Sequence, residues 1–410
     1  MKSKKPVSSK KNVIMYNRHR LDIPYFIFRT IIFGKVKFKY HSNVEKIEHP
    51  SIVLANHGAF LDFGYAGALI KKESPNFVAA RLYFYKNLTN KILRGVGCFP
   101  KSMFANDLDS AMNCLRVIRG GGVLAMMPEA RLSTVGRFED IQESTFSFLK
   151  KSGVHVYTAK LCGDYLAKPK WGKGIRRGSL VEAKLDLLFT PDELRALTVN
   201  EIKEKTESAL YYDEFAWLET HPELKYRSRN MAVGLENVIT LCPSCHSHCS
   251  FTTKGNKITC SVCGLEAEIN ERYAFKNAVP FENFALWYDW QTEQMHERFL
   301  ADESFKLSTK VELRHASRDG KHLLDLAGVG ECTLTREGLT YVGTDFGENV
   351  ERHFPAEDIY RLLFGAGEDF EIYDGKEIYY FTPEDRRECV DWYIASCILY
   401  EERTKEKEAV

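Results

Sequence analysis

The sequence lacks several patterns that would place it in a common class of protein. It contains no internal repeat and no low-complexity segment, and it has no P-loop pattern that would indicate nucleotide hydrolysis. The Gly-x-Ser-x-Gly motif is also absent, which counts against a serine hydrolase. Neither sign of charge is in excess, because the net charge is only +1, so the whole composition gives no indication of nucleic-acid binding.

The composition is that of a globular protein. Hydrophobic residues make up 44% and charged residues 28% of the 410 residues, a length that predicts two or three domains. Of the eleven cysteines, four form two Cys-x-x-Cys pairs and the others are scattered. Because no export signal is recognisable, this usage predicts a cytoplasmic protein with a metal site rather than a disulfide framework.

The N-terminal region combines basic residues with a short apolar run. Residues 1–21 contain seven Lys or Arg residues and no acid, and Ile23–Phe33 follows. This run is too short to cross a bilayer and has no small-residue cleavage site, so we predict neither a transmembrane helix nor a signal peptide. We expect residues 1–34 either to hold the protein peripherally on the inner face of the cell membrane, or to be a tail and a first core helix.

Residues 34–189 alternate short apolar runs with helical patterns, which predicts an α/β core with a mostly parallel sheet. A helix is expected after Asp107, a possible N-cap, and a second one from about Pro191 to Leu218. We assign residues 35–235 to this domain. The expected strands are Val36–Tyr40, Ile52–Ala55, Phe77–Ala80, Val123–Met127, Val154–Leu161 and Leu180–Phe189.

Residues 280–410 show a different pattern, in which strand-like alternation lies between a helical run to about Leu300 and a final helix from Pro383 to about Glu401. Several antiparallel strands closed by one helix predict a small β-rich domain of the pleckstrin-homology type. The expected strands are Lys310–Ala316, Gly330–Leu334, Leu339–Val342, Phe370–Tyr373 and Glu377–Phe381.

The two Cys-x-x-Cys pairs lie within residues 236–272, with fourteen residues between them that read as a hairpin turning at Gly255-Asn256. Two such turns predict a zinc ribbon with a tetrahedral four-cysteine site. Four thiolates leave no open position, so we expect a structural zinc ion. The predicted ligands are Cys242, Cys245, Cys260 and Cys263.

Other residues near the cysteine pairs leave alternatives open. His246, His248 and Cys249 crowd the first pair and are possible substitute ligands. Lys254 and Lys257 are followed closely by glutamates, so the ribbon carries no basic patch and nucleic-acid binding is not predicted.

The segment with the most chemical content begins with Ile52–Ala55, which reads as a short buried strand. Asn56 and Gly58 interrupt it before a helix-like stretch. His57 and Asp62 are five residues apart, about 140° around an α-helix, so they meet only if His57 lies on the turn before the helix. The carboxylate would then fix the imidazole tautomer and leave the other nitrogen as a base. The alternative is a histidine that caps the helix or is simply buried.

Two other stretches carry charged candidates. Lys101 lies in Gly97–Ser102, and Glu129 and Arg131 follow the expected strand Val123–Met127. By default Lys101 would be a solvated surface lysine, and Glu129 and Arg131 would form an exposed ion pair.

In order along the chain, these stretches resemble the motifs of the glycerolipid acyltransferase family, whose best-known members acylate 1-acylglycerol-3-phosphate (lysophosphatidate). The similarity covers about residues 25–220. The first motif, Asn-His followed by four residues and Asp, is matched by Asn56, His57 and Asp62. The second motif is matched by Gly97, Phe99 and Lys101. The third is matched by Pro128, Glu129, Arg131 and Ser133, and the fourth by Val154–Tyr157.

The resemblance implies a mechanism and partners. His57, oriented by Asp62, would remove the proton from an acceptor hydroxyl that attacks the thioester of acyl-CoA or acyl carrier protein. Lys101 and Arg131 would hold the phosphate of lysophosphatidate, and Glu129 would bind a glycerol hydroxyl or position Arg131. The product would be phosphatidate.

The sequence also departs from the family. Lys101 stands where the family prefers Arg, and the single Ala130 replaces Gly-Thr, so that Arg131 follows Glu129 by two residues. These differences leave the acceptor open between lysophosphatidate and glycerol-3-phosphate or another lysophospholipid. A second alternative is a non-catalytic scaffold that uses the zinc ribbon and the C-terminal domain.

Overall fold

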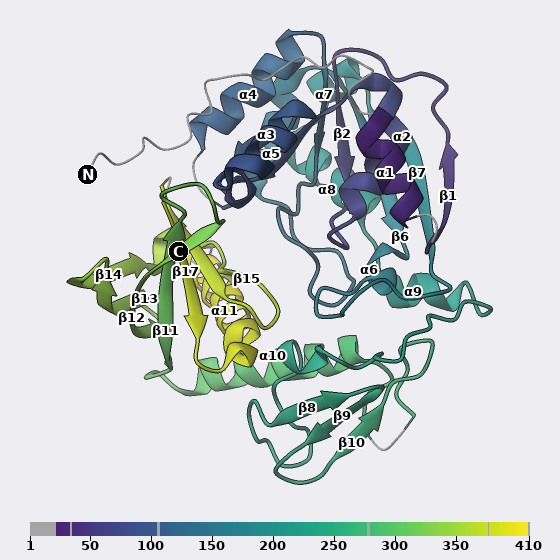
Figure 1. Cartoon of the computed structure of the whole chain (residues 1–410). Helices are drawn as coiled ribbons and strands as arrows, with labels where there is room; N and C mark the ends of the chain where they lie inside the picture. Colours follow the sequence, from purple (N-terminus) through teal and green to yellow (C-terminus); the bar gives the residue numbers. More distant parts are fainter. Residues whose placement is uncertain (1–21, 33–34, 105–106, 277–278, 376, 409–410) are drawn as a thin grey trace. The chain divides into compact units, whose positions relative to one another are not determined.

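The structure, a computed structural model, describes residues 22–32, 35–104, 107–276, 279–375 and 377–408 (Figure 1). The predicted basic arm, residues 1–21, lies outside the described residues. The chain divides into two compact units: one contains the chain up to Lys170 together with Gly174–Ser228, and the other contains Trp171–Lys173 and the chain from Arg229 onward. Among the described residues, no helix is both long and apolar enough to cross a membrane.

The first unit is built on a seven-stranded sheet in the order β1-β7-β6-β2-β5-β3-β4. Neighbouring strands are parallel, except that β6 and β7 are antiparallel, so the predicted mostly parallel sheet is confirmed. Strand β4 was not predicted, because three residues centred on Pro100 give no apolar run. The strands are β1 (Lys37–Ser42), β2 (Ser51–Ala55), β3 (Asn76–Ala80), β4 (Phe99–Lys101), β5 (Val123–Met126), β6 (His155–Cys162) and β7 (Leu180–Phe189).

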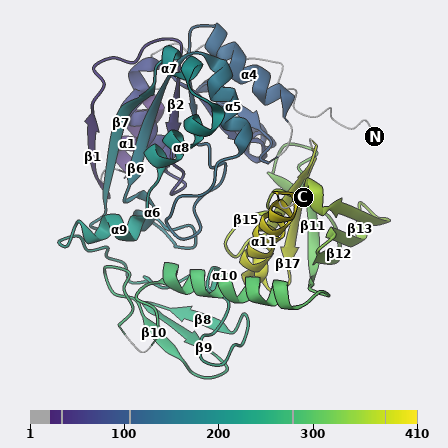
Figure 2. The same ribbon diagram turned by 180° about the vertical axis from the view of Figure 1, so that it is seen from behind.

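Helices cover both faces of this sheet (Figure 2). Every residue of β2 is buried. Alternate side chains of a strand point to opposite faces of the sheet, and helices cover both faces here. Ile52 and Leu54 pack in a cluster with α4, α5, α7 and α8, whereas Val53 and Ala55 pack in a cluster with α2. The unbroken apolar run at the start of the candidate motif is therefore the mark of a central strand. The first six α-helices of this unit are α1 (Asp22–Ile32), α2 (Asp62–Ile70), α3 (Asn87–Gly95), α4 (Leu108–Arg119), α5 (Glu143–Ser152) and α6 (Asp164–Ala167).

The prediction of one helix from about Pro191 to Leu218 is wrong. This stretch forms three helices, α7 (Pro191–Ala196), α8 (Val199–Leu210) and α9 (Glu214–Glu219). Thr190 and Thr198 each begin a helix with a reciprocal capping box, and Asp213 caps the third. Such caps satisfy the free N–H groups of a helix start and so fix new starts within an otherwise helical pattern.

The second unit begins with the cysteine-rich hairpin. Strands β8 (Phe251–Lys254) and β9 (Lys257–Cys260) pair antiparallel around the predicted turn, and β10 (Glu266–Glu268) joins the same sheet. The following helix, α10 (Phe284–Ala301), packs against this region through Trp287, whose ring lies edge-on to that of Phe251.

A seven-stranded antiparallel sheet and the helix α11 (Cys389–Glu408) complete this unit, as predicted. The sheet has the order β14-β13-β12-β11-β17-β16-β15, and α11 packs on it through a shared core in which the rings of Phe370 and Trp392 stack at 4.4 Å. The strands are β11 (Leu307–Ala316), β12 (Leu324–Thr335), β13 (Gly338–Asp345), β14 (Glu348–Pro355), β15 (Leu363–Phe364), β16 (Phe370–Asp374) and β17 (Glu377–Pro383). Of these, β14 and β15 were not predicted.

Candidate active site

The motif residues gather at one edge of the first sheet. Strands β2 to β6 run parallel to one another, so their carboxyl ends lie at the same edge. His57 follows β2, Arg81 follows β3, Lys101 ends β4, Glu129 follows β5 and Asp164 follows β6. Residues that are far apart in sequence are thereby brought to the region where open α/β sheets commonly bind ligands.

His57 and Asp62 form the pair that their spacing predicts. Asp62 is the first residue of α2, and its Oδ2 lies 2.6 Å from His57 Nδ1. The Asp62 side chain is fully buried, whereas the His57 side chain is 24% exposed. With Nδ1 held by the carboxylate, Nε2 is the nitrogen that is left to accept a proton from a substrate.

Asn56 fixes the turn that carries His57. Its amide nitrogen donates to the Leu161 carbonyl at 3.0 Å, and its amide oxygen accepts from the Leu161 N–H at 2.6 Å. The side chain therefore continues the β2–β6 ladder where the β2 backbone turns away. This accounts for an asparagine directly before the histidine, since a side chain that both donates and accepts is required.

Glu129 and Ser133 hold the backbone of His57. Glu129 is fully buried; its Oε1 accepts from the His57 N–H at 2.7 Å and its Oε2 from the Glu139 N–H at 2.9 Å. The Ser133 N–H donates to the His57 carbonyl at 3.0 Å. Burial raises the pKa of Glu129 well above its usual range, although both N–H donors oppose the shift.

Arg131 is also buried, with 5% of its side chain exposed, and its guanidinium pairs with Glu139 Oε2 at 2.5 Å. The alternative of an exposed ion pair between Glu129 and Arg131 is therefore wrong: both side chains are buried, and Arg131 forms its ion pair with Glu139. Buried groups of this kind fix the geometry of a loop because breaking either partner leaves an uncompensated charge.

Lys101 is partly buried at the end of β4, next to a network that the sequence did not predict. Buried Arg81 donates to Ser102 Oγ at 2.7 Å and to Asp107 Oδ2 at 2.5 Å. Asp107 also caps α4 as predicted, by accepting from the Ser110 N–H. The network ties the residue after Lys101 to the start of α4.

Asp164 is a second buried acid close to the His57–Asp62 pair, and it too was not predicted. Burial and the charge of Asp62 raise the pKa of Asp164 to about 7. A side chain at position 58 would collide with it, because a Cβ built on Gly58 lies 2.7 Å from Asp164 Oδ2. The signal available in the sequence was a Gly-Asp pair directly after a predicted strand.

Glu214, at the start of α9, is another buried acid near Asp164. Its two carboxyl oxygens accept from the Gly163 N–H at 2.7 and 2.9 Å. Burial, followed by the charge of Asp164, raises its pKa well above the usual range. The buried carboxyl groups of Asp164 and Glu214 are thus easier to protonate than exposed ones.

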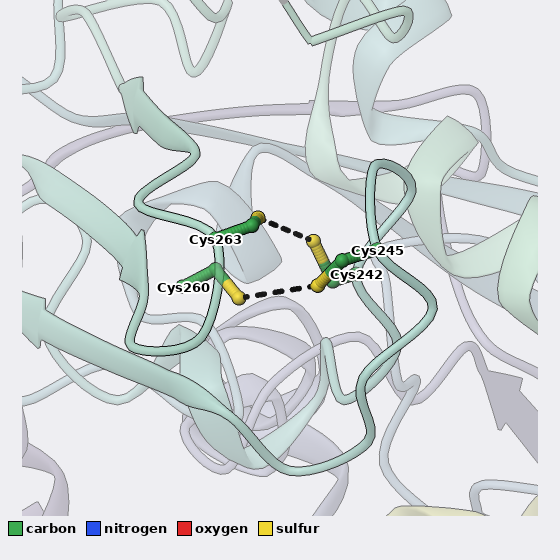
Figure 3. A group of neighbouring side chains, drawn as sticks. All are labelled: Cys242, Cys245, Cys260 and Cys263. Atoms are coloured by element: carbon green, nitrogen blue, oxygen red, sulfur yellow. Dashed lines mark hydrogen bonds between the residues drawn. The ribbon is translucent and has the colours of Figure 1, made fainter.

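The four predicted cysteine ligands come together in the second unit (Figure 3). Their sulfur atoms all lie within 4.8 Å of one another. Cys242 Sγ is 3.7 Å from Cys263 Sγ, and Cys245 Sγ is 3.8 Å from Cys260 Sγ. A tetrahedral zinc ion with Zn–S bonds of about 2.3 Å separates its sulfurs by about 3.8 Å, so these residues fit that ion.

Comparisons with known proteins address the first unit. Residues 35–161 match the family described as Acyltransferase. Among solved structures, the chain is similar to the 1-acyl-sn-glycerophosphate (LPA) acyltransferase PlsC from Thermotoga maritima, with 18% identity, 48% of this chain and 82% of that chain covered, and a TM-score of 0.37. No curated protein matches the chain. The family match includes the first three motifs and most of β6, so the predicted resemblance to an acyltransferase is confirmed for residues 35–161.

Proposed function

We propose that the protein moves a fatty acyl group from acyl-CoA or acyl carrier protein to the free hydroxyl of 1-acylglycerol-3-phosphate, which gives phosphatidate. The observation that carries the proposal is the His57–Asp62 pair at 2.6 Å, with a buried carboxylate and a partly exposed imidazole. The pair lies within the part of the chain that matches the acyltransferase family.

In this mechanism His57 Nε2 takes the proton of the acceptor hydroxyl while the oxygen attacks the thioester carbonyl carbon. The carbon–sulfur bond then breaks, and the leaving thiolate accepts this proton from His57. Asp62 keeps the imidazole in the required tautomer and stabilises the imidazolium between these steps. No covalent intermediate on the protein is needed, since the thioester is already activated.

The predicted substrate-binding residues take different parts in this proposal. Lys101, which is partly buried at the end of β4, contacts the acceptor phosphate as a point charge. Arg131 and Glu129 position parts of the site. Arg131 does so through its buried ion pair with Glu139, and Glu129 through its hydrogen bond to the backbone of His57. This assignment replaces direct phosphate contact by Arg131 with a positioning role.

The acceptor is a lipid, and we propose that the protein meets it on the inner face of the cell membrane. Helix α1 exposes Phe26, Ile27 and Ile31, at 67%, 50% and 54%, and it follows the basic residues of the N-terminal arm in the sequence. A basic segment followed in sequence by exposed apolar side chains favours an anionic membrane surface.

The test is acyl transfer by the purified full chain on phospholipid vesicles. Lysophosphatidate, glycerol-3-phosphate and a lysophospholipid without a free phosphate are offered separately, each with acyl-CoA and with acyl carrier protein. We expect phosphatidate from lysophosphatidate, its loss in His57→Ala, and normal activity in the control His41→Ala, an exposed histidine on edge strand β1.

Other outcomes select the alternatives. Product only from glycerol-3-phosphate or the other lysophospholipid would keep the chemistry and change the acceptor. No product from any acceptor with a correctly folded protein would contradict the enzyme and favour the scaffold.

We also propose that the four cysteines bind a structural zinc ion, since their sulfur atoms lie at the spacing of a closed tetrahedral site. Removing the metal with a chelator should unfold β8–β10, measured by hydrogen exchange at these strands. Unchanged protection of β8–β10 in metal-free protein would contradict a structural role.

A further inference from the structure

A second group of metal-ligand side chains lies in the same unit, apart from the four cysteines. His248 Nε2, Cys249 Sγ and a carboxylate oxygen of Asp391 all lie within 4.8 Å of one another. The Nε2 atom is 2.9 Å from Asp391 Oδ2 and 3.8 Å from Cys249 Sγ. Two neighbouring residues of the cysteine-rich segment thus face one residue in the first turn of α11.

We propose that His248, Cys249 and Asp391 bind a second divalent transition-metal ion of the zinc class. Imidazole nitrogen, thiolate sulfur and carboxylate oxygen are all zinc ligands. Around a tetrahedral zinc ion, nitrogen and sulfur ligands lie about 3.6 Å apart, close to the separation found here, and nitrogen and oxygen about 3.3 Å apart. Binding the ion therefore needs the imidazole and the carboxylate to separate by only a few tenths of an ångström.

The carboxylate is already oriented for this role. Thr240 Oγ1 donates to Asp391 Oδ1 at 2.8 Å, which leaves Oδ2 directed to His248. Metal-binding carboxylates and imidazoles are commonly held by such outer hydrogen bonds. The Asp391 side chain is 7% exposed, whereas that of His248 is 48% exposed, so solvent reaches the group from the imidazole side.

The surrounding charge favours a cation. The carboxyl groups of Asp385 and Glu388 act electrostatically on both His248 and Cys249, in addition to Asp391. Arg387 forms an ion pair with Asp385 at 2.5 Å, so these two charges cancel and Glu388 and Asp391 remain as the negative charge in excess. A dication placed among these groups would neutralise an excess of negative charge.

The backbone gives an independent indication. Cys249 has a φ of +49°, in the left-handed region that residues with a Cβ seldom adopt. The positive φ of His246 belongs to the turn after a Cys-x-x-Cys pair, since Gly264 has the same feature after the second pair. Ala267, which holds the place of Cys249 after the second pair, is not in this region, so the conformation of Cys249 is not part of the repeated turn. Such local strain often marks a functional position.

The competing interpretation is a simple ion pair between His248 and Asp391 beside a buried thiol. The two interpretations differ in the number of metal ions that the protein binds. The full chain is stripped of metal under reducing conditions and titrated with Co²⁺, a spectroscopic substitute for zinc. We expect the wild type to bind two equivalents of Co²⁺. The first should show the absorption of cobalt bound by four thiolates, and the second should add the absorption of cobalt bound by one thiolate.

The variants assign the second equivalent. Asp391→Asn keeps the size of the side chain, and it should bind one equivalent with the four-thiolate spectrum intact. Cys249→Ser should give the same result. The control is His246→Ala, a neighbouring exposed histidine outside the group, which should keep two equivalents.

One equivalent in the wild type at saturating Co²⁺ would overturn the proposal even if every variant failed to fold. Two equivalents that persist in both Asp391→Asn and Cys249→Ser would also overturn it. Neither readout depends on acyl transfer, so the result is independent of the proposed activity.

Discussion

Replacement of Asp164 by Asn tests the view that a protonatable carboxyl group lies next to the His57–Asp62 pair. Asp164 is 1% exposed, and burial together with the charge of Asp62 raises its pKa to about 7. In the unfolded chain the pKa of an aspartate is about 3.9. Because the folded-state pKa is the higher one, this group stabilises the fold below about pH 4, and its contribution is lost as the pH rises through 7.

The size of the effect follows from the two pKa values. Between pH 5 and pH 7 the folded protein keeps the proton that the unfolded chain has released, and each pH unit is worth about 1.4 kcal/mol. The free energy of unfolding of wild type should therefore fall by roughly 3 kcal/mol from pH 5 to pH 8 through this group alone. The neutral amide in Asp164→Asn does not titrate, so the variant should gain that amount relative to wild type over the same interval.

Urea unfolding is measured at pH 5 and pH 8. It is followed by hydrogen exchange at the amides of β2 and β6, which reports the stability of the first unit separately from that of the second. The matched control is Glu204→Gln, which removes an exposed carboxyl group of α8 and should leave the pH dependence unchanged. A difference between Asp164→Asn and wild type that is the same at both pH values would refute the reasoning.

Three further predictions concern the activity, the stability of the candidate site and the membrane contact. Asp62→Asn should lower kcat by about 10²–10⁴-fold, because an amide no longer fixes the tautomer of His57; an unchanged kcat on lysophosphatidate would contradict the role of Asp62. Gly58→Ala should cost about 1–3 kcal/mol in urea unfolding, since the new Cβ would lie 2.7 Å from Asp164 Oδ2, and an equally stable variant would show that this contact relaxes freely. Phe26→Ser should weaken sedimentation with anionic vesicles at little cost in thermal stability, because this side chain is 67% exposed, and unchanged sedimentation would place the membrane contact elsewhere.

The His57–Asp62 pair could be predicted because its two members are close in sequence. The run Ile52–Ala55 has the unbroken apolar pattern of a strand covered on both faces, and the following turn brings His57 to Asp62 across five residues. The cysteine ligands were found for the same reason, since each Cys-x-x-Cys pair is a single turn and one hairpin joins the two pairs.

The structure of the first sheet also explains which elements were missed. Strand β4 is too short to show a pattern, and the capped starts at Thr198 and Asp213 divide a stretch whose helical periodicity looks continuous. Capping residues are polar and lie on the surface, so they interrupt a helix without interrupting its apolar face.

The local features of this protein can be read from its residues alone: the His57–Asp62 pair, the cysteine pairs and the alternation of strands and helices. What surrounds them depends on how the chain folds. Glu129 reaches the His57 backbone across 72 residues, and Asp391 reaches His248 across 143. No periodicity records such contacts, because they depend on strand order and on the packing of whole elements. Burial, which the fold alone sets, then decides which carboxyl groups carry charge.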